Sequence, residues 1–289
     1  MRIACIDIGG TFVKSGVLEN GVLSGVKETP TRAENGAAAL LDAVAALVRG
    51  MDGAVRVGVS TAGEVDADTG AIRLSDNIPG YTGLNPKRLL QDALGMPVAV
   101  ENDVNAAAVG EHAFGAARGQ RDFLMASYGT GVGGAVFVGG ALYRGSAYSA
   151  GEFGGLLTHP QDVREGDRGS GTYERYASTS ALVARVTQKF PELTSGRKIF
   201  ANLGEKGVKT EVDAWIYEVA YGIISLLHAF NPAMIVLGGG IMREEYIRQA
   251  LSRVLAPMTK PSFADYALVP ARLGNSAGMM GAGYLASQL

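Results

Sequence analysis

A glycine-rich strand–turn–strand pattern occurs twice in the chain, and this repeat constrains the fold more than any other feature. In each copy an apolar run ends in a glycine turn and a second apolar run follows. Gly9 and Gly129 lie 120 residues apart, and Gly21 and Gly140, in the turns that come next, lie 119 apart. Repetition at this spacing predicts two similar domains facing one cleft.

The first glycine turn, Gly9-Gly10-Thr11, is expected to join two strands of a hairpin. Asn20-Gly21, which comes after the second strand, is a strong hairpin signal. Because glycine has no Cβ, backbone N–H groups in the first turn can approach a phosphate closely. An ordinary tight hairpin is the simpler interpretation of this segment alone. It is neither a Walker P-loop, which needs Gly-Lys-Ser/Thr at a helix start, nor a Rossmann fingerprint, since a strand follows.

Hydrophobic periodicity and turn residues predict an α/β chain of two domains. One strand is expected to end at residue 8, and a second is expected to begin at about residue 12. Further strands and helices follow along the chain. We expect further strands at 55–60, 97–100, 123–127, 135–138, 141–143, 234–237 and 268–269, and helices at 35–48, 85–94, 106–114, 173–190, 212–230, from near 243, and at 275–287. The expected domains are 1–115 and 116–275, with a closing helix at about 276–289 that packs on the first.

The segment 101–105, Glu-Asn-Asp-Val-Asn, places a carboxylate and amides between an expected strand and an expected helix. Ligands of α/β sheets bind at this edge, where such groups can hydrogen-bond hydroxyls. Asp103 alone could also be only a helix cap. A third glycine turn, Gly238-Gly239-Gly240, precedes another helix and suits an α-phosphate or nucleoside. Together the three turns suit a nucleoside triphosphate, with Asp103 as candidate base for a hydroxyl that attacks its γ-phosphate.

Composition excludes several other classes of protein. Lys plus Arg number 26 against 28 Asp plus Glu, which argues against a nucleic-acid surface. The single cysteine, Cys5, excludes an intramolecular disulfide and a cysteine-rich zinc site. The most apolar stretch, 223–242, is interrupted by His228, Asn231-Pro232 and three glycines, and no signal sequence precedes the first strand. We expect a cytoplasmic protein that binds neither nucleic acid nor membrane.

These motifs in this order resemble the ROK family of sugar kinases, transcriptional repressors and related open reading frames, in the actin-like ATPase superfamily. Residues 7–11 resemble the family's first phosphate motif, 129–134 its second, and Gly151-Glu152-Phe153-Gly154 its sugar motif. The resemblance covers essentially the whole chain. It implies two actin-like (ribonuclease H-like) domains around an interdomain cleft, and a homodimer.

The resemblance also implies roles for individual residues. Asp103 is the implied catalytic base, and Asp7 is implied to reach Mg²⁺ through water. The implied sugar-binding residues are Gly63, Asn102, Asp103, Glu152 and Glu174. The implied ATP-binding residues are Asp7, Gly9, Gly10, Thr11, Gly129, Thr130, Gly131, Gly133, Gly238, Gly239 and Gly240. Lys14 is expected to be a solvated charge at a strand edge rather than a phosphate ligand.

One residue departs from the family pattern. Most members have a His after Gly-Glu-x-Gly that contacts the sugar and joins three cysteines around a structural zinc, whereas this chain has Gly155. The corresponding segment 165–172 has no cysteine, so no zinc site is expected. His159 is interpreted as a surface or sugar-site residue.

The expected function is ATP-dependent phosphorylation of a hexose or hexoside primary hydroxyl at O6, with glucose or a β-glucoside favoured. N-acetylmannosamine or fructose is the alternative acceptor. The alternative of another class is a non-catalytic sugar sensor or regulator. Repressors of the family carry a DNA-binding segment before the first phosphate motif, whereas Asp7 here follows the N-terminus almost at once. That difference, and the presence of Asp103, favour the kinase.

Overall fold

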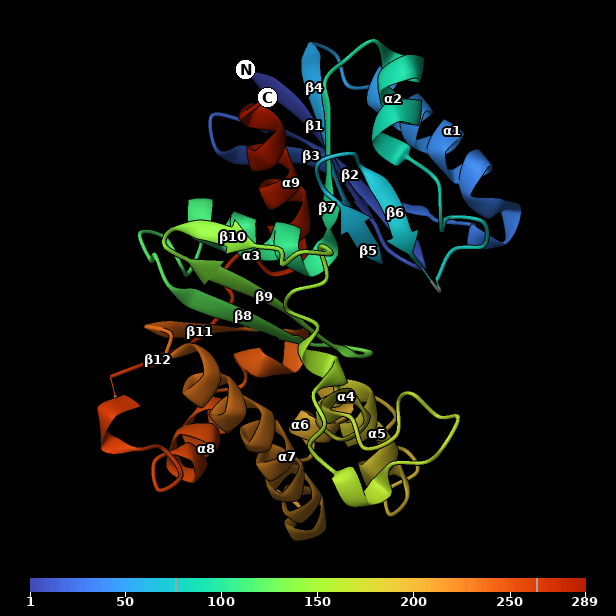
Figure 1. Cartoon of the computed structure of the whole chain (residues 1–289). Helices are drawn as coiled ribbons and strands as arrows, with labels where there is room; N and C mark the ends of the chain where they lie inside the picture. Colours follow the sequence, from blue (N-terminus) through green and yellow to red (C-terminus); the bar gives the residue numbers. More distant parts are fainter. Residues whose placement is uncertain (76, 264) are drawn as a thin grey trace. The chain divides into compact units, whose positions relative to one another are not determined.

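The computed structural model describes residues 1–75, 77–263 and 265–289 (Figure 1). The chain forms two compact units. The first comprises residues 1–119, 142–150 and 275–289, and the second comprises residues 120–141 and 151–274.

The first unit is built on a five-stranded sheet of order β3-β2-β1-β4-β7. Strands β1, β4 and β7 are parallel, and β1, β2 and β3 are antiparallel neighbours. The predicted hairpin turn at Asn20-Gly21 is confirmed, with φ of 50° and 79°. The sheet strands are β1 (Arg2–Ile8), β2 (Phe12–Glu19), β3 (Val22–Pro30), β4 (Ala54–Thr61) and β7 (Val98–Asn102). A small hairpin, β5 (Glu64–Asp66) with β6 (Ala71–Leu74), follows β4, between the strand predicted at 55–60 and the helix predicted at 85–94.

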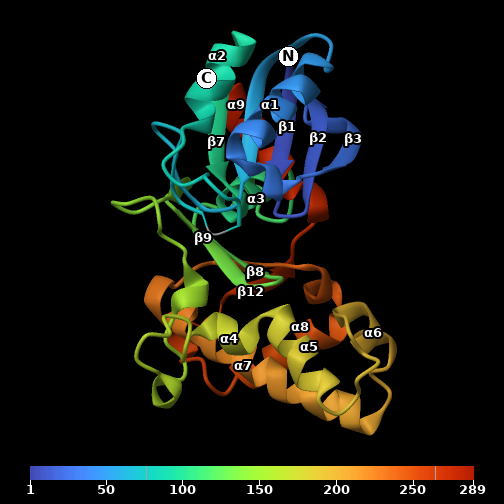
Figure 2. The same cartoon turned by 90° about the vertical axis from the view of Figure 1, so that its right-hand side faces the viewer.

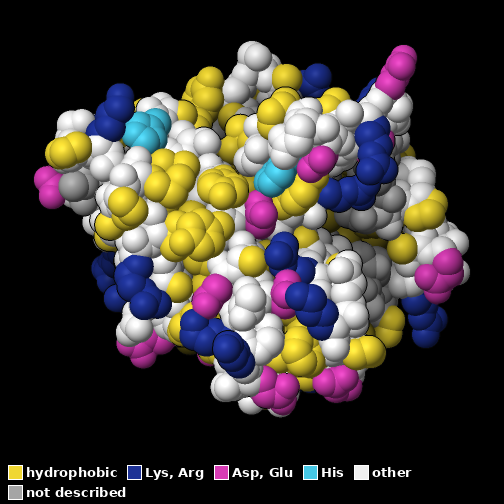
Figure 3. Space-filling view, turned by 90° about the horizontal axis from the view of Figure 1, so that it is seen from below, with side chains coloured by type: hydrophobic (Ala, Val, Ile, Leu, Met, Phe, Trp, Pro, Cys, Tyr) yellow, Lys and Arg dark blue, Asp and Glu magenta, His cyan; other side chains and the backbone are white. Residues whose placement is uncertain are grey.

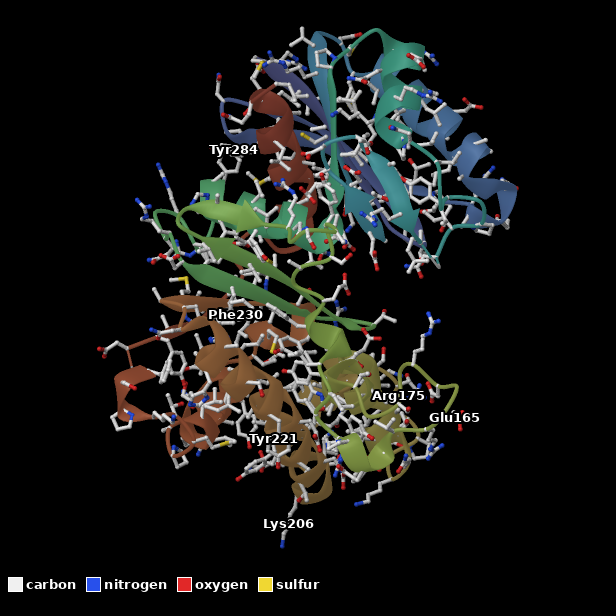
Figure 4. All side chains as sticks on the ribbon, in the orientation of Figure 1. Glu165, Arg175, Lys206, Tyr221, Phe230 and Tyr284 are labelled. Atoms are coloured by element: carbon white, nitrogen blue, oxygen red, sulfur yellow. The ribbon has the colours of Figure 1, made fainter. Side chains whose placement is uncertain are left out.

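Helices cover both faces of this sheet. Leucine and valine side chains of α1 (Gly36–Arg49), with Leu90 of α2 (Pro86–Leu94), pack into the core on one face. Helix α2 is capped by Asn85, whose side chain accepts the Arg88 N–H at 2.9 Å. On the other face, α9 (Ala277–Ser287) packs against β4 and against α3 (Asp103–Phe114). Tyr284 of α9, labelled in Figure 4, meets Phe114 of α3 edge to face at 5.9 Å.

Small residues allow α9 to approach α3 and the sheet closely. A Cβ on Gly110 would lie 2.5 Å from the Ala277 carbonyl oxygen, and one on Gly281 would lie 2.7 Å from the Gly110 nitrogen. These distances are shorter than side-chain carbons tolerate, so glycine is required at both positions. The closing helix therefore belongs to the core of the first unit.

The second unit repeats this plan. Its sheet has the order β10-β9-β8-β11-β12, which matches the first sheet strand for strand. The strands are β8 (Phe123–Tyr128), β9 (Val132–Val138), β10 (Ala141–Tyr143), β11 (Met234–Gly238) and β12 (Ala267–Pro270). Strands β8, β11 and β12 are parallel, and β9 is antiparallel to β8. The predicted repeat and the α/β class are confirmed.

Five α-helices are described in this unit, and their apolar side chains form its core with the sheet. Figure 2 shows these helices below β8 and β12 of that sheet. They are α4 (Tyr173–Ala177), α5 (Thr179–Thr187), α6 (Gly196–Ala201), α7 (Lys206–Phe230) and α8 (Glu245–Leu255). Figure 4 labels Lys206 and Phe230, the first and last residues of α7, which is six residues longer at its start than predicted.

The single helix predicted over 173–190 is wrong, because the chain is extended at Ser178. Its side chain caps α5 by accepting the Ala181 N–H, and the Trp215 indole N–H lies 3.1 Å from both the Ala177 and Ser178 carbonyl oxygens. The buried indole thus binds carbonyl groups that a continuous helix would have used internally.

Residues 142–150 group with the first unit, although the sequence placed them in the second domain.

No helix among the described residues 1–75, 77–263 and 265–289 is long and apolar enough to cross a membrane. On the face seen in Figure 3, basic and acidic side chains are interspersed, and apolar side chains gather on its left.

Candidate active site

Asp7 lies at the end of β1 in the first unit, between two side chains of neighbouring strands. The Ser60 hydroxyl donates to Asp7 Oδ1 at 2.7 Å, and Lys14 Nζ lies 3.5 Å from Asp7 Oδ2. Both partners face Asp7 directly in the strand register. The expectation that Lys14 is a solvated edge charge is therefore wrong, because pairing across the hairpin directs its ammonium group to Asp7.

The first glycine turn follows Asp7 and is held by the segment after β3. The Gly9 N–H donates to the Phe12 carbonyl at 3.0 Å, and the Thr31 hydroxyl donates to the Gly9 carbonyl at 2.7 Å. Gly10 and Thr11 are exposed at the tip of the turn. No heavy atom of the described residues lies within 4 Å of a Cβ built on Gly10. The turn is thus fixed at its base and accessible at its tip, as a phosphate site requires.

Asp103 is the first residue of α3, and the helix cap is Asn102. The Asn102 side-chain oxygen accepts the N–H groups of Val104 and Asn105 at 3.0 Å each. Its amide nitrogen donates to Asp103 Oδ1 at 3.1 Å, and the Val104 N–H donates to the same oxygen at 2.9 Å. The interpretation of Asp103 as only a cap is wrong, since Asn102 fills that role and also orients the Asp103 carboxylate.

Gly63 joins this group through its carbonyl oxygen, which accepts the Asn102 amide at 3.0 Å. Its φ is 108°, and a Cβ would lie 2.6 Å from the Leu74 carbonyl oxygen. Only glycine fits this position. The structure therefore brings Gly63, Asn102 and Asp103 together at the carboxyl ends of β4 and β7.

The second unit places Glu174 beside the second glycine turn. The Val132 N–H donates to Glu174 Oε2 at 2.9 Å, and a Cβ on Gly131 would overlap the same carboxylate. The Gly129 N–H closes the turn by donating to the Gly131 carbonyl at 2.9 Å. Gly133, expected in the turn, lies instead within β9 opposite Ser127. The strand begins at Val132 because antiparallel pairing with β8 extends that far.

Glu152 precedes a short 3₁₀ turn, Phe153–Gly155, and is exposed. Phe153 is buried and anchors this turn to the core. Gly155 is exposed, and no described heavy atom lies within 4 Å of a Cβ built on it. There is room at this position for a larger side chain or for part of a ligand.

A cavity of about 1010 Å³ in the second unit joins the second and third glycine turns. Gly239, with φ of 102°, lies against Tyr128, so closely that a Cβ would be 2.9 Å from the Tyr128 carbonyl carbon. Residues of α5 and α6 also line this cavity, and the sequence did not indicate them because they form no recognisable motif. The local signal in this part of the lining is Ser195, a helix-capping residue at the start of α6. The lining residues are Tyr128, Gly129, Thr130, Thr179, Ser180, Val183, Ala184, Thr194, Ser195, Gly196, Arg197, Phe200, Ala201, Gly240, Ile241 and Glu244. The volume of this cavity suits a nucleotide.

The segment that resembles the family's zinc region is held by side-chain contacts. His159 stacks on Tyr176 at 3.7 Å, and its Nε2 lies 3.3 Å from Glu218 Oε2 of α7. The Tyr176 hydroxyl donates to Asp162 at 2.5 Å, which raises the pKa of Tyr176. Burial raises the pKa of Glu218, and the nearby His159 partly offsets this effect. Among the described residues, no three His, Cys, Asp or Glu side chains gather as metal ligands would.

Two five-stranded sheets of one topology, each with a glycine turn after its first strand, define an actin-like two-domain fold. The chain matches the ROK family over residues 3–289 and belongs to it. A glucokinase from Streptomyces coelicolor is 32% identical, over 98% of this chain and 96% of its own. A β-glucoside kinase from Listeria innocua is also 32% identical, over 98% of this chain and 97% of its own.

A solved structure shows the same likeness over the full chain. The glucokinase from Streptomyces griseus, solved with glucose and AMPPNP, is 29% identical. It covers 100% of both chains with a TM-score of 0.87. The family resemblance predicted from the sequence motifs is confirmed.

Proposed function

We propose that this protein transfers the γ-phosphoryl group of ATP to the O6 hydroxyl of a hexose or hexoside, with glucose or a β-glucoside as the acceptor. The observation that carries the proposal is the orientation of Asp103. Its carboxylate is held at the start of α3 by Asn102 and the Val104 N–H, at the sheet edge where ligands of α/β folds bind. The glucokinase and β-glucoside kinase relatives support the choice of acceptor.

Asp103 acts as the general base in this proposal. It accepts the proton of the sugar hydroxyl while that oxygen attacks the γ-phosphorus in line. Asn102 contributes by holding Oδ1 of Asp103, so that the carboxylate is directed before the sugar binds. Such fixed geometry lowers the entropy that the reaction must lose at its transition state.

ATP is held by the glycine turns and by the cavity of the second unit. The turns at Gly9–Thr11 and Gly129–Gly131 present backbone N–H groups to phosphoryl oxygens, where charge develops in the transition state. The nucleoside occupies the cavity beside Gly240. Mg²⁺ neutralises phosphate charge and is commonly held by one or two carboxylates together with phosphates and water. Asp7, a single carboxylate beside the first turn, fits that donor set.

Glu152 and Glu174 bind sugar hydroxyls. The Glu174 carboxylate is fixed to the Val132 N–H, and this contact orients it for a second hydrogen bond. The open space at Gly155 favours an acceptor with a substituent, such as the aglycone of a β-glucoside. The N-acetyl group of N-acetylmannosamine is the second candidate on the same ground. We also propose that the protein is a homodimer, which light scattering at known concentration would test.

The test is an ADP-release assay over free hexoses, amino sugars and β-glucosides, run on the wild type and on Asp103→Asn. The variant keeps the volume of the side chain but cannot accept a proton. General-base removal lowers rates by about 10²–10⁴-fold, so kcat should fall by at least that much while sugar binding survives. Activity above about a tenth of wild type would exclude Asp103 as the base.

A further inference from the structure

Three side chains tie the segment 142–150 to the rest of the first unit. The Tyr148 hydroxyl donates to Asp68 at 2.6 Å, and the Ser149 hydroxyl donates to Glu64 at 2.9 Å. Both of these contacts are at least partly exposed. The third contact differs, because Arg144 reaches Glu101, whose side chain is only 1% exposed.

Each oxygen of the Glu101 carboxylate accepts two hydrogen bonds. Its Oε2 accepts from Arg144 Nε at 2.8 Å and from Arg144 Nη2 at 2.7 Å. Its Oε1 accepts from the Asn102 N–H at 3.0 Å and from the Asn105 amide at 3.3 Å. Both guanidinium donors converge on Oε2 and fix that oxygen, while Asn102 and Asn105 bind the other oxygen, so the carboxylate is held at both ends. The Oε1 atom therefore holds Asn102 at a defined place.

Asn102 transmits this position to the proposed base. Its backbone N–H binds Glu101, while its side chain caps α3 and donates to Asp103 Oδ1. A continuous series of hydrogen bonds thus runs from Arg144 through Glu101 and Asn102 to Asp103. The series stays within one unit and ends on the Asp103 carboxylate, the proposed base.

We infer that Arg144 is a positioning residue for phosphoryl transfer, acting through Glu101 and Asn102 on Asp103. The inference rests on the proposed role of Asp103 as base. Without the guanidinium group, the buried Glu101 carboxylate loses its counter-charge and both donors to Oε2. Rotation of the carboxylate towards water or another donor would displace Oε1 from the Asn102 N–H. A misplacement of about 1 Å at reacting atoms can lower a rate by about 10²-fold.

The first test compares Arg144→Met with the wild type. Binding of AMPPNP counts the folded molecules, so that kcat can be expressed per active site. We expect kcat to fall by about 10- to 100-fold, with KM for ATP changed by less than about twofold. Arg144→Lys, which keeps the charge but not the paired donors, should lose less. A folded Arg144→Met variant with kcat within about twofold of wild type would overturn the inference.

Two control variants test whether the effect comes from Arg144 positioning Asp103 or only from keeping the segment 142–150 in place. Tyr148→Phe and Ser149→Ala remove the other contacts of 142–150 and should leave kcat within about twofold. A loss equal to that of Arg144→Met in either control would overturn the inference, because it would assign the effect to the whole segment. If Arg144→Met does not fold, Arg144→Lys and Glu101→Gln take its place, and both should fold with a lowered kcat.

A double variant tests the route through Glu101. Arg144→Met with Glu101→Gln removes the unpaired charge and keeps a side-chain oxygen that can accept the Asn102 N–H. Its kcat should exceed that of Arg144→Met alone. An equal or lower kcat would overturn the proposed route. Asp103→Asn is measured alongside: if it stays active, the base assignment fails, whereas an inactive Asp103→Asn with an unaffected Arg144→Met rejects only this inference.

Discussion

A methyl group added at Gly281 should destabilise the first unit, although the same change stabilises an isolated helix. In a helix interior, alanine is favoured over glycine by about 0.8–1 kcal/mol. Here, however, a Cβ at Gly281 would lie 2.7 Å from both the Ala106 carbonyl carbon and the Gly110 nitrogen, and closer still to the Ala106 oxygen. All three atoms belong to the backbone of α3, which cannot rotate away as a side chain would.

The two helices must therefore separate. Overpacking of this kind costs about 1–3 kcal/mol, and a backbone obstacle places the cost at the upper end. After the gain in helix propensity, a net loss of about 2 kcal/mol in the free energy of unfolding remains. Since α3 begins with Asp103, kcat should fall as well.

Urea unfolding followed by far-UV circular dichroism measures the loss. Gly204→Ala, in a turn of the second unit, is the control for a methyl group added in open space, because no described heavy atom lies within 4 Å of a Cβ there. That control should stay within about 0.5 kcal/mol of wild type. The fluorescence of Trp215, the single tryptophan of the sequence, follows the second unit in parallel. A Gly281→Ala protein as stable as wild type would refute the close packing of α9 on α3.

Three further predictions concern specificity, pH and metal. Gly155→His should fill the open space and lower the ratio of kcat/KM for a β-glucoside disaccharide to that for glucose; an unchanged ratio would remove Gly155 as a determinant. Burial raises the pKa of Glu218 above 4.5, so its protonated form stabilises the fold at low pH and that contribution is lost as pH rises through the raised value. Glu218→Gln should therefore gain in Tm relative to wild type between pH 4 and 8, and a difference independent of pH would contradict this. Purified protein should contain no stoichiometric zinc and resist unfolding by a chelator, yet lose activity without Mg²⁺; zinc near one per chain would contradict the first part.

Local patterns in the sequence were sufficient for most elements of both sheets. The apolar runs, the hairpin turn at Asn20-Gly21 and the cap at Asn85 each act within a few residues, so a single sequence reveals them. The break at Ser178 was missed for the opposite reason. Trp215, which binds the carbonyls at the break, lies 37 residues away in the chain.

The sequence by itself determined the repeat, the order of the glycine turns and the residue proposed as base, because these depend on residue type and spacing. The tertiary structure decided which side chains meet. Strand register brings Lys14 to Asp7, and the return of segment 142–150 to the first unit brings Arg144 to Glu101. Such contacts depend on how distant segments pack, and the residue type of an arginine does not show which partner it contacts. Burial alone turns Glu101 from a surface charge into a carboxylate that requires a partner.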